Sequence, residues 1–143
     1  MTFSMRSSAG YLTNHLARLF ASGLQARIRP LGLSTGVFPV MLQLWDRDGL
    51  TQKELVDRLG IEQATVANTL ARMERDGLIE RRGDAEDGRV KRTWLTDQGR
   101  ALRDPAIAAA DAENSDALSG LTEAERAQLL TLLNKAIATF GTR

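Results

Sequence analysis

Short polar side chains that can bind the edges of nucleic-acid bases are concentrated in one stretch, residues 62–76. Gln63 and Asn68 carry amides that can form paired hydrogen bonds with adenine, and Thr65 can bond to a base edge or a phosphate. The methyl group of Ala64 is complementary to that of thymine. The side chains predicted to contact DNA in this stretch are Gln63, Ala64, Thr65, Asn68, Thr69 and Arg72.

The same stretch has the pattern of a helix that packs by one face. Val66, Leu70 and Met73 recur at spacings of four and three, which places them on one side of an α-helix, and Gly77 ends it. The short side chains of the opposite side would let the helix enter the major groove. An ordinary solvent-exposed helix would show a similar pattern, so this stretch alone leaves both interpretations open.

A second helix is predicted just before this one, after a tight turn. Residues 51–54, Thr-Gln-Lys-Glu, form a capping box, in which the threonine hydroxyl accepts from an N–H and the glutamate reaches back. The helix that it opens would bury Leu55, Val56 and Leu59, and Gly60 permits the turn that follows. Two short helices with this spacing predict a helix-turn-helix.

A basic hairpin follows, with strands predicted at 78–82 and 90–95 around the loop GDAEDG. Arg89 can extend one guanidinium from the end of this loop, which suits the narrow and strongly negative minor groove of A·T-rich DNA. Asp87 would hold that guanidinium in place. The alternative is a mobile hairpin tip with an incidental ion pair. The hairpin side chains predicted to contact DNA are Asp87, Arg89, Arg82 and Lys91.

Four further amphipathic helices are predicted around these elements, at about 8–29, 35–46, 97–117 and 122–140. Pro39 requires the second of them to start late or to have an irregular first turn, and Pro105 is expected to kink or interrupt the third. The predicted fold class is mainly α with a small β-wing, in the order α-α-α-α-β-β-α-α. A one-bridge strand near Gly49 is also expected.

The composition excludes several kinds of chemistry. The 143 residues include no cysteine and one histidine, His15, which removes thiol nucleophiles, Cys-based zinc sites and His-rich metal sites. We predict that the protein is not an enzyme and uses no cofactor. No stretch reaches the roughly 20 apolar residues that span a bilayer, and the first 20 residues lack the apolar core of a signal peptide. A cytoplasmic protein that does not enter membranes is therefore expected.

Residues 51–102 resemble the signature region of the MarR-type (multiple antibiotic resistance regulator) transcription factors. That region has a helix ending in Leu-Gly, a recognition helix with Thr-Val, then Gly-Leu-Ile/Val-x-Arg, a wing Asp-x-x-Asp-x-Arg, and Leu-Thr-x-x-Gly. The matching residues here are Thr65-Val66, Gly77-Leu78-Ile79, Arg81, Asp84, Asp87, Arg89, Leu95-Thr96 and Gly99. Gly88 stands where the family often has an arginine, so one basic contact of the wing is missing.

The resemblance implies a winged helix-turn-helix inserted in a helical dimerisation frame. Residues 34–97 would form the DNA-binding part, and residues 1–33 and 98–143 the dimerisation region. A homodimer would read a pseudo-palindromic operator in double-stranded DNA, and repression is the expected mode. The predicted last helix has apolar residues on more than one face, which independently favours a partner helix.

The resemblance also implies release from DNA by a small effector, often an aromatic or phenolic anion. His15 and Arg18 could supply the cation, and Met41 and Trp45 the apolar wall. The alternative is that Met41 and Trp45 belong to the core and that the two basic side chains pair with acids of the other subunit. A winged helix that acts through protein–protein contacts without specific DNA binding is the alternative for the whole chain.

Overall fold

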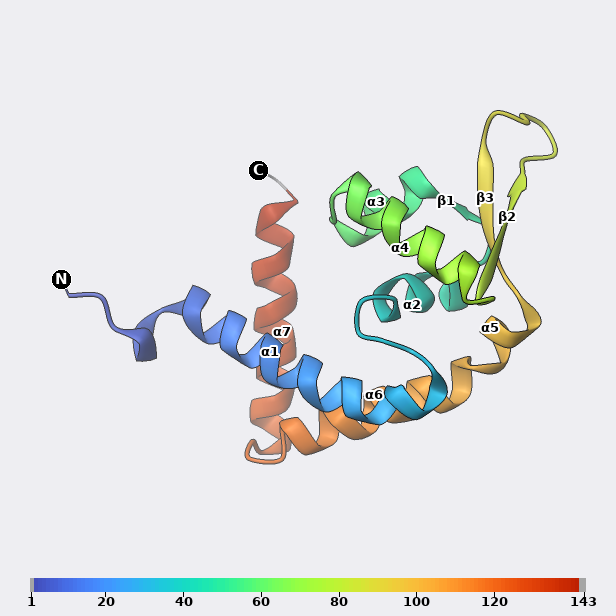
Figure 1. Ribbon diagram of the computed structural model, residues 1–143. Helices are drawn as coiled ribbons and strands as arrows, with labels where there is room; N and C mark the ends of the chain where they lie inside the picture. Colours follow the sequence, from blue (N-terminus) through green and yellow to red (C-terminus); the bar gives the residue numbers. More distant parts are fainter. Residues whose placement is uncertain (1, 142–143) are drawn as a thin grey trace.

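The computed structural model describes residues 2–141 as an assembly of helices with one small sheet at its edge (Figure 1). The outer helices are α1 (Ala9–Ile28), α6 (Arg103–Ala117) and α7 (Glu123–Phe140), with 3-10 turns at Met5–Ser7 and Arg29–Leu31. Between them in the sequence lie α2 (Phe38–Asp46), β1 (Leu50–Thr51), α3 (Gln52–Leu59), α4 (Gln63–Arg75), β2 (Ile79–Gly83), β3 (Lys91–Leu95) and α5 (Asp97–Ala101). The predicted fold class is confirmed.

The sheet is antiparallel, with β3 in the centre between β1 and β2. β2 and β3 form the predicted hairpin, in which Arg82 lies opposite Arg92 and Gly83 opposite Lys91. Leu50 of β1 lies opposite Thr93 and supplies the strand that was expected near Gly49. The hairpin loop projects away from α1 and α6 and forms the wing (Figure 1).

The hydrophobic core lies mostly under the helix-turn-helix. Met41 and Leu44 from α2, Leu55 from α3, and Leu70 and Met73 from α4 are all fully buried. Full burial of such a side chain contributes roughly 1.5–3 kcal/mol. The spacing of the apolar residues on α4 therefore fixes which face of this helix turns inward, and it leaves the opposite face in solvent.

Helix starts follow the predicted capping chemistry. The Thr51 hydroxyl accepts from the backbone N–H of Glu54 at 3.1 Å, and the Glu54 carboxylate accepts from the N–H of Thr51 at 3.0 Å. α2 starts late, at Phe38, so that Pro39 is its second residue, where no intrahelical N–H bond is lost.

The prediction of one helix over 97–117 interrupted at Pro105 is wrong. α5 ends at Ala101 and α6 begins at Arg103, so the break lies at Leu102. Pro105 falls in the first turn of α6, where its missing N–H would have had no helical partner.

The outer helices form a long frame on one side of the winged helix (Figure 1). α1 and α6 lie side by side and are joined by Arg27, whose Nε donates to Glu113 at 3.1 Å. Gly23 leaves room for this carboxylate, because a Cβ there would collide with it. α7 turns back from the far end of α6, and none of its residues is buried against the described chain. No helix within residues 2–141 is both long and apolar enough to span a bilayer.

Candidate nucleic-acid interface

One face of α4 is an exposed stripe along the whole helix. Ala64, Asn68, Ala71 and Arg75 recur at spacings of four, three and four, and all four are exposed. Arg75 was missed as a site residue in the sequence, although it lies seven residues after Asn68 and therefore on the same face. The predicted residues Gln63, Ala64, Thr65, Asn68 and Arg72 are also exposed. This arrangement presents short polar groups at the start of the helix and cations at its end.

The prediction that Thr69 faces outward is wrong. Only 9% of Thr69 is exposed, and its hydroxyl donates to the backbone oxygen of Thr65 at 2.9 Å. A threonine inside a helix commonly bonds to the carbonyl four residues earlier, which satisfies its hydroxyl without solvent. Thr69 therefore lines the edge of the packed face and has no free hydroxyl for a base.

The wing tip presents a single extended cation. The Arg89 side chain is 91% exposed, and the Asp87 carboxylate accepts from its Nε at 3.2 Å and from its Nη2 at 3.4 Å. The same carboxylate accepts from the backbone N–H of Arg89 at 3.1 Å. Asp87 therefore fixes both the backbone and the side chain of Arg89, in the arrangement predicted from the sequence.

Asp84 orders the rest of the wing loop. One of its oxygens accepts from the backbone N–H groups of Glu86 and Asp87 at 3.0 and 3.1 Å, and the other from Nε of Arg92 at 2.6 Å. The Arg92 guanidinium, helped by these two N–H groups, holds the pKa of the Asp84 carboxyl below its ordinary value. Asp84 therefore closes the loop into a hydrogen-bonded turn.

Arg92 also attaches the wing to the helix-turn-helix. Its Nη1 donates to the backbone oxygen of Gly49 at 3.0 Å and lies 3.5 Å from the Glu54 carboxylate. The bond from the N–H of Thr51 is the main cause of the lowered pKa of Glu54, and Arg92 adds to it. One side chain thus joins the wing loop, the strand β1 and the capping box of α3. Arg92 was not among the residues predicted to contact DNA, and the register of the hairpin was needed to find its role.

The other cations of the wing differ in whether neighbouring side chains hold them in place. Arg82 donates from Nε to Glu80 at 2.6 Å, and its guanidinium lies 5.5 Å from the centre of the Trp94 ring. Lys91 is exposed on β3. Arg81 donates to the side chain of Gln52 on α3 at 2.9 Å. The wing strands therefore carry cations whose positions are set by neighbours, apart from Lys91.

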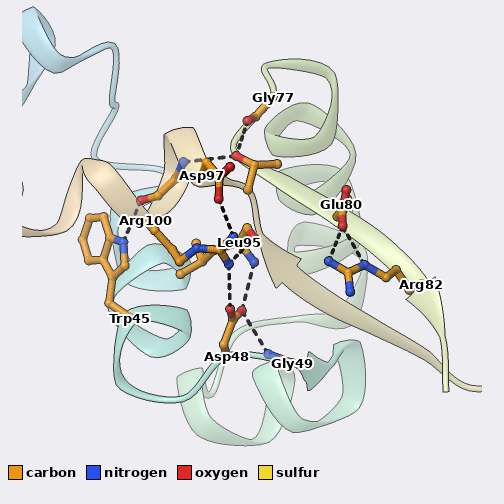
Figure 2. A network of polar contacts seen from close by, with 11 residues as sticks. Trp45, Asp48, Gly49, Gly77, Glu80, Arg82, Leu95, Asp97 and Arg100 are labelled. Atoms are coloured by element: carbon orange, nitrogen blue, oxygen red, sulfur yellow. Dashed lines mark hydrogen bonds and ion pairs between the residues drawn. The ribbon is translucent and has the colours of Figure 1, made fainter. Parts of the chain in front are cut away.

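Asp48 joins the base of the wing to the body of the domain (Figure 2). One Asp48 oxygen accepts from the backbone N–H groups of Gly49 and Leu95, at 3.0 and 2.9 Å. Arg100 lies 3.6 Å from the other oxygen and donates to the carbonyl of Leu95 at 2.8 Å. The end of β3 is thus held between an acid that follows α2 and a base on α5.

A second set of bonds connects α5 to the end of α4. The Thr96 hydroxyl donates to the carbonyl of Gly77, just after the recognition helix, at 2.6 Å and accepts from the N–H of Gly99. Trp45 of α2 donates from its indole N–H to the carbonyl of Gly99 at 2.9 Å. A Cβ on Gly99 would lie 2.3 Å from the carbonyl oxygen of Leu78, so only glycine permits this close approach.

The four residues predicted to bind an effector are not brought together. Met41 is fully buried in the core, and the indole N–H of Trp45 is already bonded to Gly99. His15 and Arg18 are exposed on α1, where His15 lines a shallow apolar groove. Within one chain, two of the four residues serve the core and two lie on a separate surface, and their role in binding an effector stays a prediction.

A hollow of about 370 Å³ lies instead between α1, α2 and α6. Phe20 and Leu24 of α1 face Phe38 and Leu42 of α2 across it, and Glu113 of α6 is its one charged lining residue. The sequence could not locate it, because its walls come from three helices whose crossing is set by packing.

Comparison with known proteins places this geometry in a family. Residues 31–90 match the model of the MarR family. The transcriptional regulator HosA of Escherichia coli is 33% identical over 102 residues, which cover 71% of this chain and 76% of HosA. The chain belongs to the MarR family. MarR proteins such as HosA are transcriptional regulators and not enzymes.

Two solved MarR-type structures extend the likeness to nearly the whole chain. A putative MarR family regulator from Listeria monocytogenes, complexed with a 26mer DNA, has a TM-score of 0.81 and 27% identity, covering 97% of this chain and 89% of that one. BpsR of Bordetella bronchiseptica, whose DNA binding is regulated by 6-hydroxynicotinic acid, has a TM-score of 0.86 and 26% identity, covering 95% and 97%.

Proposed function

We propose that this MarR regulator binds double-stranded DNA as a homodimer, represses transcription, and is released by a small effector. The observation that carries the proposal is the joint presence of the exposed α4 stripe and of Arg89 on a braced wing. Asn68 and its neighbours would read the major groove, while Arg89 would enter the adjacent minor groove. Repression by occlusion requires only that the protein occupy its site on DNA.

The uncovered apolar surface of the frame supports a homodimer. On α7, Leu132 is 54% exposed and Ile137 is 67% exposed, and Leu12 and Leu19 of α1 are also exposed. We assign residues 1–33 and 98–143 to dimerisation and 34–97 to DNA binding. Two-fold symmetry would place the two recognition helices about one DNA turn apart, roughly 34–36 Å, which matches a pseudo-palindromic operator.

The hollow between the frame and the winged helix supports control by a small aromatic molecule. Two aromatic side chains, Phe20 and Phe38, line it. Phe38 also packs edge to face on Trp45, with ring centroids 6.1 Å apart. The indole N–H of Trp45 is bonded to the carbonyl of Gly99 in α5. We call this contact, together with the bond from Thr96 to Gly77, the joint at Gly99. A ligand that displaced Phe38 would therefore act on the joint that orients the recognition helix. The regulation of BpsR by 6-hydroxynicotinic acid is consistent with a ligand of this size.

The test is a gel-shift titration with the DNA that flanks the protein's own gene. We expect a shift at low salt, and we expect Arg89→Ala to weaken it by about 1–3 kcal/mol. Arg103→Ala is the control, since Arg103 is an exposed arginine on α6. Asn68→Ala should instead alter the preferred bases.

Two results would contradict this proposal. One is the absence of any shift by the wild-type protein at low salt. The other is a loss of helical circular dichroism in Arg89→Ala, which would make Arg89 a structural residue.

A further inference from the structure

Among the described residues 2–141, no lysine, arginine or histidine lines the hollow between α1, α2 and α6. Glu113 is its one charged lining residue, and Thr35 and Asn114 are the neutral polar ones. The rest of the wall is apolar and includes the rings of Phe20 and Phe38. The lining therefore constrains the charge of the molecule that the hollow can bind.

One oxygen of the Glu113 carboxylate is available to a ligand. Oε1 accepts from Nε of Arg27 at 3.1 Å, whereas Oε2 has no hydrogen-bond donor within the part of the chain that the structure describes. The carboxylate lies against the backbone of Gly23, where an added Cβ would collide with it. The Glu113 side chain is thus held in place by two contacts on α1 and keeps 14% of its surface exposed.

Arg27 does not neutralise the acids beside the hollow. It also donates from Nη2 to Asp116, so that one guanidinium is shared between two carboxylates. One positive and two negative groups give this cluster a net negative charge. α2 carries no basic residue. The other basic residues of α1 and α6 do not line the hollow, and they are His15, Arg18 and Arg103.

The sign of this charge distinguishes ligands that have the same shape. An aromatic carboxylate would leave water for apolar walls and an acid, and its own charge would stay unpaired. An ammonium group could donate to Oε2 of Glu113 near the protein interior, where opposite charges attract more strongly than in water. The rings of Phe20 and Phe38 add to this attraction, because the face of an aromatic ring attracts a cation.

We propose that this hollow binds a protonated aromatic amine, with the ring between Phe20 and Phe38 and the ammonium group donating to Glu113. The inference rests on the proposed function, in which the hollow is the effector site, and it adds the chemical class of the effector. It differs from the expectation that the family resemblance implies, which is an aromatic or phenolic anion.

The experiment is calorimetric titration at neutral pH with three ligands of similar shape. Naphthylmethylamine is a cation, naphthylmethanol is neutral and naphthoate is an anion. We expect the wild-type protein to bind the amine about tenfold or more tightly than the alcohol, because only the amine gains the attraction of the acid. The naphthoate should bind more weakly than the alcohol.

Two variants should move the affinity for the amine in opposite directions. Glu113→Gln keeps the shape of the side chain without its charge and should weaken amine binding about tenfold, with a much smaller change for the alcohol. Arg27→Gln removes the cation that partly neutralises Glu113, so the amine should bind more tightly. Glu123→Gln is the control for loss of a glutamate, because Glu123 is exposed on α7 away from the hollow, and it should change no affinity.

A third variant tests where the ligand binds. Leu42 lines the hollow, so Leu42→Trp would place a ring inside it and should abolish binding of all three ligands. The thermal midpoint shows whether each variant is folded. The comparison of amine, alcohol and naphthoate on the wild-type protein tests the proposal even if a variant does not fold.

Three results would overturn the proposal: a wild-type protein that prefers naphthoate to the amine, one that does not bind the amine, or an unchanged preference in folded Glu113→Gln. The proposed regulator still stands in each case if the wild-type protein shifts the DNA beside its own gene. If the amine binds with the expected preference but does not release that DNA, the ligand class is supported and the effector role in the proposed function fails.

Discussion

The apolar side chains of the winged helix are buried within the chain, whereas those of α7 are exposed. Leu70 and Met41 of the winged helix are fully buried among residues of the same chain. Leu132 and Ile137 of α7 have the same kind of side chain and remain mostly in solvent. One region therefore has a core of its own, and the other presents an apolar surface that the described chain does not cover. This difference is the physical reason for proposing a second copy as the partner.

The largest expected effect comes from placing charges on the uncovered surface. Leu133→Glu combined with Ile137→Glu puts two carboxylates one helical turn apart on α7. If this surface is buried in a dimer, each unpaired charge should cost about 3 kcal/mol or more. Light scattering at micromolar concentration should then show a dimer for the wild type and a monomer for the variant.

Thr131→Glu is the control for the added charge on α7, because Thr131 is exposed and lies on the side of the helix away from Leu133 and Ile137. It should leave the dimer intact. If the wild-type protein were a monomer, the proposal that a second copy covers α7 would be contradicted. A double variant that stays dimeric would contradict it as well.

A smaller effect, on the free energy of unfolding, is expected when one leucine in each region is replaced by alanine. Leu70→Ala leaves a cavity in the core and should lower the free energy of unfolding by about 2–5 kcal/mol. Leu132→Ala removes the same atoms from a surface that is exposed within one chain. Urea denaturation followed by circular dichroism in the monomeric double variant should show the loss only for Leu70→Ala. Equal losses would mean that α7 packs on the winged helix in solution.

The smallest effect concerns the wing and depends on pH. The folded pKa of Asp84 is below its ordinary value of about 4, so its contribution to stability is present above that value. The contribution is lost as the pH falls through the lower folded pKa. The thermal midpoints of the wild type and Asp84→Asn should therefore differ most near neutral pH and converge below about pH 4.

Asp57→Asn on α3 is the matched control for losing one negative charge, since Asp57 is exposed. A difference between the wild type and Asp84→Asn that does not change with pH would show that the Asp84–Arg92 contact is not formed in solution.

Features that depend on neighbours in the sequence were predictable. The capping box at residues 51–54 and the turn at Gly60 involve residues at most a few positions apart, and the apolar period of α4 is a property of one helix. The contact between Asp87 and Arg89 spans two residues. The exposed recognition surface and the braced wing tip followed from these local patterns.

Features that depend on the crossing of elements were not predictable. Thr69 has the composition of a DNA contact, but neighbouring segments bury its position on the helix. The break at Leu102 reflects the way α5 closes on Gly77 and Leu78, whereas the sequence pointed to Pro105. The hollow between α1, α2 and α6 was not predicted for the same reason, because its walls depend on where the three helices meet.

The joint at Gly99 has a consequence for optical experiments. The sequence contains two tryptophans, Trp45 and Trp94. Trp45 donates its indole N–H to the joint, and Trp94 lies at the base of the wing beneath the Arg82 guanidinium. Replacing either one by phenylalanine would leave a single tryptophan at a defined end of the winged helix. The protein thus carries two built-in spectroscopic labels, one for movement of α2 against α5 and one for movement of the wing.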